Sequence, residues 1–500
     1  MILLYVLLGL VTVLYTFVTW NHGYWKKKGI PHISPLPGFG NMLDTFISRR
    51  SSTFILVDLY QKFPNAPACG FFNLRTPSLL IRSPNYIESI LVKNFSSFHD
   101  NNNSYVDKES DPYFSTDPFF SSGTDWKTNR AAMIPMLSPG KVKAMFLAMK
   151  EIMKQMEDYL ENNSENIDAK HFATLFTSDI IANCVFGIQS NSFLEGDNHI
   201  FRKLNKKVME SFHNPLKGLI FVSFPRIAKF LRCRLVPDSA YTFLKEVIMQ
   251  VKEFRETNHI VRNDFINALL SAYNKAIQDN DGCIENPEVL LLGRAISFFI
   301  EGVETSAITI SYILYELAVN PKVQETLKKE ILSAFSKRED IEYETLQNLP
   351  YLNKVISETL RKYPPVLVLK KKCTENITLD MDGTKLEIEK GTPVFIPNYS
   401  LQNDHQYFSN PDVFDPERFS EENIACRPQY SYLPFGEGPR ICIGMRFAFT
   451  QIKLGIAIIL LKYRIVSCEQ TPKKVHLNKL GIFSSTMEKL MVKIEKCLDT

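Results

Sequence analysis

The sequence predicts a mainly α-helical protein with small β-sheets. Three features predict this class: an uncharged apolar run at the N-terminus, long stretches in which apolar residues recur at helical spacing, and only short strand-like segments, all in the second half. The 500 residues allow two to four domains or one unusually large one. A hydrophobic fraction of 45% supplies a sizeable core, and a formal charge of +4 does not favour a nucleic-acid-binding protein.

Residues 1–20 form the first element and carry no charged side chain. About 20 helical residues cover the ~30 Å hydrocarbon layer of a membrane. Lysines follow at 26–28, so the positive-inside rule places the downstream chain in the cytosol. A cleaved signal peptide is the alternative, but it carries its positive charge before the apolar run. We therefore expect a retained transmembrane anchor over 1–20, with Trp20 and Trp25 at the membrane interface.

Residues 21–40 are expected to form a basic and proline-rich hinge. Three prolines stiffen the stretch, and glycines at 29, 38 and 40 let it turn. A plain surface loop is the alternative. The hinge precedes a body that spans residues 41–500.

The body contains one helix that is much longer than the others. Asn286-Pro287-Glu288 supplies an N-cap, a first-turn proline and an acidic residue, and the helix runs to Val319. A second helix is expected over 351–363, where Pro364 and Pro365 end it. Short strands are expected at 366–369, 377–379, 386–388 and 394–396, with a hairpin turn at Asp382-Gly383 and a further helix over 447–461.

Nine cysteines are scattered through the chain, and no C-x-x-C occurs. A zinc ribbon, a clustered iron–sulfur motif and a dense disulfide framework therefore have no support. The sequence also lacks H-E-x-x-H, a Walker A loop and G-x-G-x-x-G.

One cysteine, Cys442, lies in a glycine-punctuated loop, F-G-E-G-P-R-I-C-I-G over residues 435–444. Turns at the glycines 436 and 438 would let backbone amides point at the sulfur and stabilise a thiolate that donates to a metal. Phe435 can shield that sulfur from water, and Arg440 can pair with a carboxylate on the rim of a flat cofactor. A lone loop cysteine is otherwise more often structural or inert.

This loop resembles the haem-binding signature F-G-x-G-x-R-x-C-x-G of the cytochrome P450 superfamily at every fixed position. The resemblance extends over residues 30–500, and E-T-L-R-K-Y-P-P at 358–365 is similar to the insect microsomal family-6 enzymes. It implies the cytochrome P450 fold for 41–500, as a single large haem-thiolate catalytic domain. It also implies haem b, with Cys442 as the axial ligand of the iron.

The segment E-T-L-R places Glu358 and Arg361 on one helix face. An exposed ion pair of little energetic value is the plain interpretation. The resemblance adds Arg418, from P-E-R-F at 416–419, as the second arginine of a Glu–Arg–Arg network. One carboxylate that binds two guanidinium groups would lock the loop leading to the cysteine, which is a structural role.

Trp126 and Arg130 lie one helical turn apart, which amphipathic packing alone could explain. The resemblance implies that both hold the haem propionates, together with Arg440. It also implies a basic residue on the strand after the second helix, and Lys371 is the best match in the run 370–372. Lysine supplies charge but not the planar fork of arginine.

Gly302, Glu304 and Thr305 lie near the middle of the long helix. Glycine costs a helix roughly 1 kcal/mol relative to alanine, so Gly302 followed by Thr305 suggests a local bulge that admits dioxygen. The resemblance implies that Thr305 and Glu304 supply protons. The alternative is a core helix whose threonine bonds back to its own backbone.

Glu301 departs from the usual A-G-x-[DE]-T form of this segment. E-G-x-E-T resembles the E-G-x-D-T of family-4 fatty-acid hydroxylases, whose glutamate can form an ester with a haem methyl. We hypothesise a partial covalent link between Glu301 and haem. The alternatives are a pocket carboxylate that touches water or substrate, which is costly to bury unless paired or protonated, and a shift of alignment in one loop.

The resemblance implies a monooxygenase that hydroxylates or epoxidises lipophilic molecules such as xenobiotics, plant toxins, insecticides or hormone-like lipids. Aromatic residues at 114, 119 and 120 favour an apolar substrate or simple core filling. NADPH–cytochrome P450 reductase at the endoplasmic reticulum membrane is the expected electron donor, with cytochrome b5 as a second candidate. The reductase would dock on a patch of basic residues, namely Lys127, Arg130, Lys141, Lys143 and Arg440. A haem-thiolate isomerase or dehydratase and a non-catalytic lipophile-binding haem protein are the rival functions.

Overall fold

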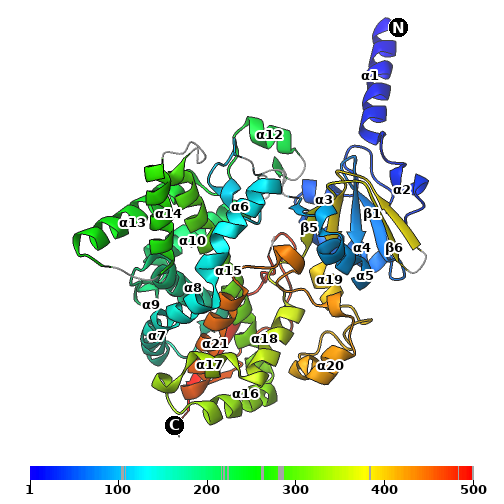
Figure 1. Ribbon diagram of the computed structural model, residues 1–500. Helices are drawn as coiled ribbons and strands as arrows, with labels where there is room; N and C mark the ends of the chain where they lie inside the picture. Colours follow the sequence, from blue (N-terminus) through cyan, green and yellow to red (C-terminus); the bar gives the residue numbers. More distant parts are fainter. Residues whose placement is uncertain are drawn as a thin grey trace.

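The structure is a computed structural model that describes residues 1–102, 106, 108–214, 217, 220–221, 224–260, 264–279, 286–381, 384–481 and 483–497. Its helices gather on one side of the molecule and its larger sheet on the other, below a helix that projects away from the body (Figure 1). The prediction of a mainly α-helical fold with small sheets is confirmed.

The principal helices are α1 (Ile2–Thr19), α2 (Tyr24–Lys27), α3 (Leu43–Phe46), α4 (Ser52–Lys62), α5 (Pro84–Glu88), α6 (Gly123–Met133), α7 (Pro139–Asn162), α8 (Ala169–Phe186), α9 (Ser192–Glu195), α10 (Ile200–Phe212), α12 (Pro225–Phe230), α13 (Asp238–Thr257), α14 (Phe265–Asp279), α15 (Pro287–Val319), α16 (Pro321–Ala334), α17 (Tyr343–Gln347), α18 (Pro350–Lys362), α19 (Asn398–Gln402), α20 (Glu421–Ala425) and α21 (Met445–Lys462). Short η segments that matter below are η1 (Ser89–Lys93), η3 (Phe114–Thr116), η7 (Pro416–Phe419) and η9 (Gly438–Arg440).

The strands form three sheets. The largest has the order β1-β2-β8-β5-β3, in which β2 and β8 are parallel and the other neighbours are antiparallel. A second sheet has the order β4-β10-β9, and β6 pairs with β7 as a hairpin. The bounds are β1 (Ala68–Asn73), β2 (Thr76–Ile81), β3 (Asp100–Asn101), β4 (Ile167–Asp168), β5 (Leu369–Lys372), β6 (Ile377–Met381), β7 (Thr384–Ile388), β8 (Pro393–Ile396), β9 (Tyr463–Val466) and β10 (Met491–Lys496).

The core is centred on α15, which packs most extensively against α8. Both helices are buried on nearly every side, so neither has a broad solvent face. A Cβ added at Gly302 of α15 would lie 2.6 Å from Cδ1 of Ile181 on α8. Gly302 therefore lets the two helices approach, and α15 runs without interruption through this point. The prediction of a local bulge is wrong, because the glycine serves close packing.

The N-terminal segment divides into an exposed helix and a packed remainder. No residue of α1 is buried, and α1 is long and apolar enough to cross a membrane. α15 passes the same test of length and composition, but it is mostly buried inside the body. Trp25, in contrast, is 1% exposed, and its indole N–H donates to the carbonyl of Phe71 at 3.0 Å. The prediction that Trp25 lies at the membrane interface is wrong, because Gly70 leaves room for its ring on the sheet.

Most of the predicted elements are present. The long helix is α15, the helix before the paired prolines is α18, the hairpin is β6–β7, and the helix after the cysteine loop is α21. The predicted turn at Asp382-Gly383 lies outside the described residues. The strand predicted over 366–369 is wrong, because β5 begins only at Leu369, where the chain starts to pair with β8.

Candidate active site

Cys442 lies between a tight loop and the start of α21. Gly436 and Gly438 have φ of 72° and 73°, which favours glycine, and a Cβ at Gly438 would lie 2.1 Å from the carbonyl oxygen of Leu91. The amide of Cys442 donates to the carbonyl of Phe435 at 2.9 Å and closes the loop. The Phe435 ring is half-buried and packs against Phe449, with the ring centroids 5.4 Å apart.

The sulfur of Cys442 receives the first amides of α21. The backbone N–H groups of Gly444 and Met445 donate to it, so the donors come from a helix N-terminus and not from the turns at 436 and 438 as predicted. Burial and the nearby Glu301 nevertheless raise the pKa of the thiol to about 11. The Cys442 side chain is exposed, so its sulfur is open to a ligand. A metal ion there would ionise the thiol outright.

Four basic or N–H-bearing side chains gather beside the cysteine loop. The guanidinium of Arg440 lies 4.4 Å from the Trp126 ring centroid, and Arg130 donates to the carbonyl of Ile441 at 2.8 Å. Lys371 is 4% exposed, and burial together with Arg440 lowers its pKa to about 7. Among the described residues, neither Nζ of Lys371 nor Nε1 of Trp126 has a hydrogen-bond acceptor.

These unsatisfied donors fit an anionic cofactor. Buried polar groups in folded proteins nearly always have partners, so Lys371 and Trp126 point to carboxylates that a ligand brings. A thiol surrounded by amide donors, beside a cluster of cations, is the donor set that a haem with two propionates requires. The residues present therefore fit this group.

The guanidinium of Arg440 already has hydrogen-bond partners within the chain. Its guanidinium donates to the carbonyls of His99, Pro118 and Ser121, and it lies 3.6 Å from a carboxylate oxygen of Asp100. The Arg440 side chain is only 5% exposed, so it does not belong to the exposed basic patch that the sequence predicted. It ties the cysteine loop to the segment before α6.

On α15, Thr305 and Glu304 point to different partners. The hydroxyl of Thr305 donates to the carbonyl of Glu301 at 2.6 Å, which is the back-bonded arrangement considered as the alternative. The carboxylate of Glu304 lies 2.9 Å from Nζ of Lys170 on α8. Burial would raise the pKa of Glu304, but Lys170 overcomes this effect and lowers it. The structure does not bring Glu304 together with Thr305.

Glu301 has a partner that the sequence did not reveal. Its carboxyl shares a hydrogen bond with Asp117, which is completely buried and also accepts from the amide of Phe119 at 2.6 Å. Burial and the charge of Asp117 raise the pKa of Glu301 well above its ordinary value. The Glu301 side chain is exposed and lies near Cys442, because its charge contributes to the raised pKa of the thiol. The Glu301 carboxyl therefore holds its proton more tightly than an ordinary glutamate does.

The structure brings Glu358, Arg361 and Arg418 together. Arg361 binds Glu358 through two N–H groups, at 2.7 and 3.0 Å, and Nε of Arg418 lies 3.4 Å from the same carboxylate. The amide of Asp415 donates to Glu358 at 3.0 Å. Glu358 and Arg361 have fully buried side chains. The remaining N–H groups of Arg361 bind the carbonyls of Gln402 and Pro411, which hold the chain before the cysteine loop.

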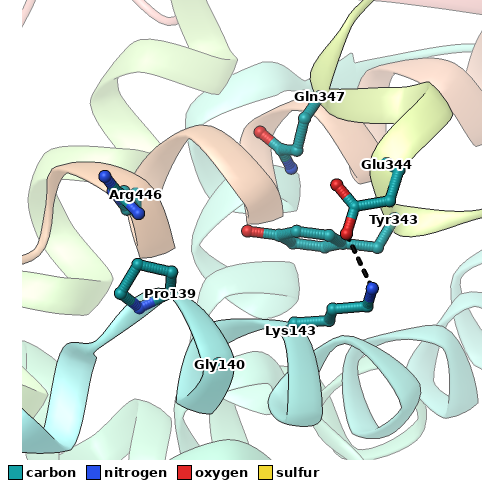
Figure 2. A pocket seen from close by; sticks show the side chains of 7 residues that line it. All are labelled: Pro139, Gly140, Lys143, Tyr343, Glu344, Gln347 and Arg446. Atoms are coloured by element: carbon teal, nitrogen blue, oxygen red, sulfur yellow. Dashed lines mark hydrogen bonds and ion pairs between the residues drawn. The ribbon is translucent and has the colours of Figure 1, made fainter.

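A surface pocket of about 370 Å³ lies next to the start of α21 (Figure 2). It is lined by Pro139, Gly140, Lys143, Tyr343, Glu344, Gln347 and Arg446. Lys143 pairs with Glu344 at 2.6 Å on one side, and the exposed Arg446 lies on the other. Arg446 is the second residue of α21, which begins three residues after Cys442 in the sequence.

Aromatic side chains cluster between η3 and α10. Phe114 contacts Phe120 and Phe212, with centroid distances of 4.5 and 6.0 Å. Phe119 is 43% exposed and contacts Phe120.

Comparison with known proteins agrees with this geometry. A family model described as cytochrome P450 matches residues 31–494. The chain is 36% identical to cytochrome P450 6k1 of Blattella germanica, over 95% of this chain and 93% of that protein. It is 34% identical to cytochrome P450 6a2 of Drosophila melanogaster, over 99% of both chains. It is also 34% identical to cytochrome P450 6A1 of Musca domestica, over 95% of this chain and 94% of that protein.

Proposed function

Because this chain belongs to the cytochrome P450 family and is thereby a haem-thiolate monooxygenase, we propose that its reaction is organised around Cys442 as the axial ligand of haem iron. Bound haem b supplies the activation of dioxygen, with electrons that reach it from NADPH through a reductase. One observation carries the proposal. The sulfur of Cys442 accepts hydrogen bonds from backbone amides, and the nearby buried donors of Lys371 and Trp126 lack acceptors.

The cofactor would be held by charge and by hydrogen bonds. Lys371 and Trp126 have free donors for propionates, and Arg130 adds a guanidinium that is only partly used. Arg440 would contribute mainly through its charge, because backbone carbonyls occupy its N–H groups. Phe435 limits the access of water to the sulfur from the loop side.

The proposed path for protons runs through Glu304 and Thr305 on α15. Glu304 is held as a carboxylate by Lys170, whose side chain is 30% exposed, so this pair links the helix core with solvent. Thr305 lies one residue further on α15, and rotation of its hydroxyl would free it from the Glu301 carbonyl to pass a proton onward. Gly302 keeps this stretch of α15 close to α8.

For Glu301, the contact with Asp117 supports the role of a pocket carboxyl that hydrogen-bonds to water or substrate. The covalent link to haem remains the second hypothesis. Chromatography of denatured, catalytically cycled protein tests it: haem that separates wholly from polypeptide excludes the link.

The reductase would dock on the face that carries the pocket beside α21. Arg446 is exposed there, whereas Lys143 is neutralised by Glu344; Lys127 is a further exposed cation, on α6. Complementary acidic groups on a partner would gain most from exposed cations without a partner of their own. Cytochrome b5 is a second candidate for the same surface.

The endoplasmic reticulum membrane is the proposed location, with α1 as anchor and residues 41–500 in the cytosol. The apolar surface of α12 supports this placement, because Ile227, Phe230 and Leu231 are exposed and α12 lies at the same end of the molecule as α1 (Figure 1). Residues 21–40 pack on the body through Trp25, so this hinge would hold the body at a set angle to the bilayer.

The substrate would be a lipophilic organic molecule. The decisive experiment is a carbon-monoxide difference spectrum of the reduced protein, followed by a substrate screen with reductase and NADPH. We expect a Soret band characteristic of thiolate ligation and NADPH-dependent product. A reduced carbon-monoxide complex without that band would overturn the assignment of Cys442.

A further inference from the structure

Gln451 on α21 joins this helix to α15 through its side-chain amide. Nε2 of Gln451 donates to the backbone carbonyl of Gly302 at 3.3 Å and to the hydroxyl oxygen of Ser306 at 2.6 Å. Gln451 and Ser306 are both buried. Gly302 and Ser306 lie on either side of Thr305 on α15, and α21 begins three residues after Cys442. One buried side chain therefore connects the helix behind the cysteine loop with the helix that carries the proposed proton path.

The two hydrogen bonds of Gln451 are the polar part of the contact between α15 and α21. Among the residues that the structure describes, no other side-chain hydrogen bond or ion pair joins these two helices. The helices also meet through apolar side chains, such as the rings of Phe298 and Phe447, whose centroids lie 5.7 Å apart. Apolar contacts are non-directional, whereas a hydrogen bond weakens steeply when its angle changes. A movement of α15 along α21 would therefore break the bonds of Gln451 before the apolar contact is lost.

The fold does not need these bonds to satisfy the Gly302 carbonyl. α15 is helical throughout this stretch, so the amide of Ser306 already donates to that carbonyl. The orientation of the Gln451 amide is fixed, because only a donor can face a carbonyl oxygen. Its Oε1 is buried without a donor in the described part of the chain, which lowers stability. The stability of the fold therefore does not account for a glutamine at this position.

Gln324 on α16 is a second buried glutamine that binds α15, and its bonds have a structural reason. Its Nε2 donates to the carbonyls of Leu317, at 3.0 Å, and of Ile465, at 2.6 Å, and its Oε1 accepts from the amide of Ile465 at 2.8 Å. Leu317 lies in the last turn of α15, and the residue four positions later is Pro321, which has no N–H to donate. Gln324 thus satisfies a helix end and is itself satisfied, whereas Gln451 does neither.

We propose that Gln451 is a positioning residue. It sets where the turn of α15 that carries Thr305 lies relative to Cys442. α8 holds the same turn from another side, because Ile181 leaves no room for a Cβ at Gly302. This inference deepens the proposed function and rests on it only for the effect on the reaction. A displacement of about 1 Å at a reacting group can cost roughly a hundredfold in rate.

Loss of the link would change the products of the reaction. In the intact enzyme, NADPH, a proton and O2 convert the substrate to a product that carries one oxygen atom, and the other oxygen atom leaves as water. With Thr305 displaced, the two electrons of NADPH reduce O2 with two protons to H2O2, and the substrate leaves unchanged. The share of NADPH that ends as H2O2 therefore reports the position of Thr305.

Hydrogen exchange of the full-length holoenzyme, measured by mass spectrometry, tests the link without turnover. Gln451→Met keeps the length of the side chain and removes the amide, and Gln324→Met is the matched control. We expect Q451M to exchange about three- to tenfold faster in peptides that cover residues 302–306, which is the factor for loss of one hydrogen bond. Q324M should exchange faster only near the end of α15. Unchanged exchange of residues 302–306 in Q451M would overturn the proposal.

Turnover with reductase, NADPH and 7-ethoxycoumarin as a lipophilic probe tests the consequence for the reaction. We expect Q451M to form at least about threefold less product per NADPH than wild type, with a matching rise in H2O2, and Q324M to match wild type. An equal H2O2 share in Q451M and wild type would contradict the positioning role. If Q451M does not fold, Ser306→Ala removes the shorter bond alone and should raise the H2O2 share by a smaller factor, and no rise would then overturn the proposal.

The carbon-monoxide difference spectrum, recorded on each variant, separates this inference from the proposed function. Q451M should keep the thiolate band of wild type, because the amides at the start of α21 are unchanged. Absence of that band from wild type would overturn the assignment of Cys442, whereas the hydrogen-exchange result on Gln451 would still stand.

Discussion

Two ionic regions of this molecule differ in how completely their charges are satisfied. In the lock formed by Glu358, Arg361 and Arg418, the carboxylate meets two guanidinium groups and one amide, and the spare N–H groups of Arg361 reach carbonyls. Beside the cysteine loop, Lys371 and Trp126 have donors without acceptors in the described chain. In the lock, Nε of Arg418 also lacks a hydrogen bond, but it lies 3.4 Å from the Glu358 carboxylate that balances its charge. Lys371 and Trp126 have no such group in the described chain, so the second region is complete only with a ligand.

Replacement of Cys442 by serine should have the largest effect, because it removes the sulfur and leaves both ionic regions intact. We expect loss of the thiolate Soret band and of detectable monooxygenase turnover, with an unchanged far-ultraviolet circular dichroism spectrum. The carbon-monoxide difference spectrum and NADPH-dependent product formation measure the change. If the thiolate Soret band and the turnover both persist, Cys442 is not the haem ligand, and the unsatisfied donors of Lys371 and Trp126 need another explanation.

Glu358→Ala should destabilise the protein by about 3–5 kcal/mol, since it leaves the buried guanidinium of Arg361 and the partly buried one of Arg418 without a carboxylate. Urea unfolding measures the free energy. The control is Glu417→Ala, which removes the partly exposed pair with Lys354 at 2.8 Å and should cost less than about 1 kcal/mol. Equal losses in the two variants would contradict the comparison between a buried lock and an ordinary surface pair.

Lys371→Met should reduce haem retention by about tenfold and leave the apoprotein no less stable, because Lys371 has no acceptor there. Competition with apomyoglobin measures haem release. Burial lowers the pKa of Lys371 in the folded protein to about 7, from the ordinary 10.5. Between these values the unfolded chain binds more protons, so the stability of the apoprotein should rise with pH.

That pH dependence has its own control. The rise in unfolding free energy between about pH 7 and pH 10 should be smaller in the Lys371→Met apoprotein than in wild type, as measured by urea titration at several pH values. Identical slopes would show that Lys371 is not desolvated in the folded chain.

Arg446→Glu should have the smallest effect, on partner binding alone. We expect the apparent affinity for reductase to fall about fivefold at low salt and the difference to shrink as ionic strength rises. Steady-state NADPH oxidation at varied reductase measures it. Lys474→Glu, a charge reversal at another exposed lysine, is the control and should leave the affinity unchanged.

Local patterns predicted the elements whose causes are local. The caps of α15, the prolines that end α18 and the glycine loop before Cys442 all act over a few residues, and each is present. The lock was predictable because E-x-x-R and P-E-R-F occur in the expected order. Gly302 shows where local patterns fail. A glycine is needed there because Ile181, on a helix more than a hundred residues earlier, packs against it.

The features that were missed depend on long-range contacts. Asp117 has no motif of its own and matters because it meets Glu301. Trp25 follows an apolar run and precedes lysines, which is typical of an interface residue, yet the sheet offers it a place at Gly70. Arg440 matches its motif, but the three carbonyls that bind it belong to a segment about 320 residues earlier.

The insertion of Trp25 into the sheet has a consequence for how the enzyme meets its substrates. With the indole hydrogen-bonded to the carbonyl of Phe71 only a few residues after α1 ends, the proposed membrane-spanning α1 would hold the catalytic body in one orientation to the bilayer. A molecule dissolved in the lipid would then encounter the same side of the protein on every approach. Such a molecule would reach the enzyme by lateral diffusion within the bilayer. The orientation of the body would then influence which molecules enter, in addition to the shape of the substrate pocket.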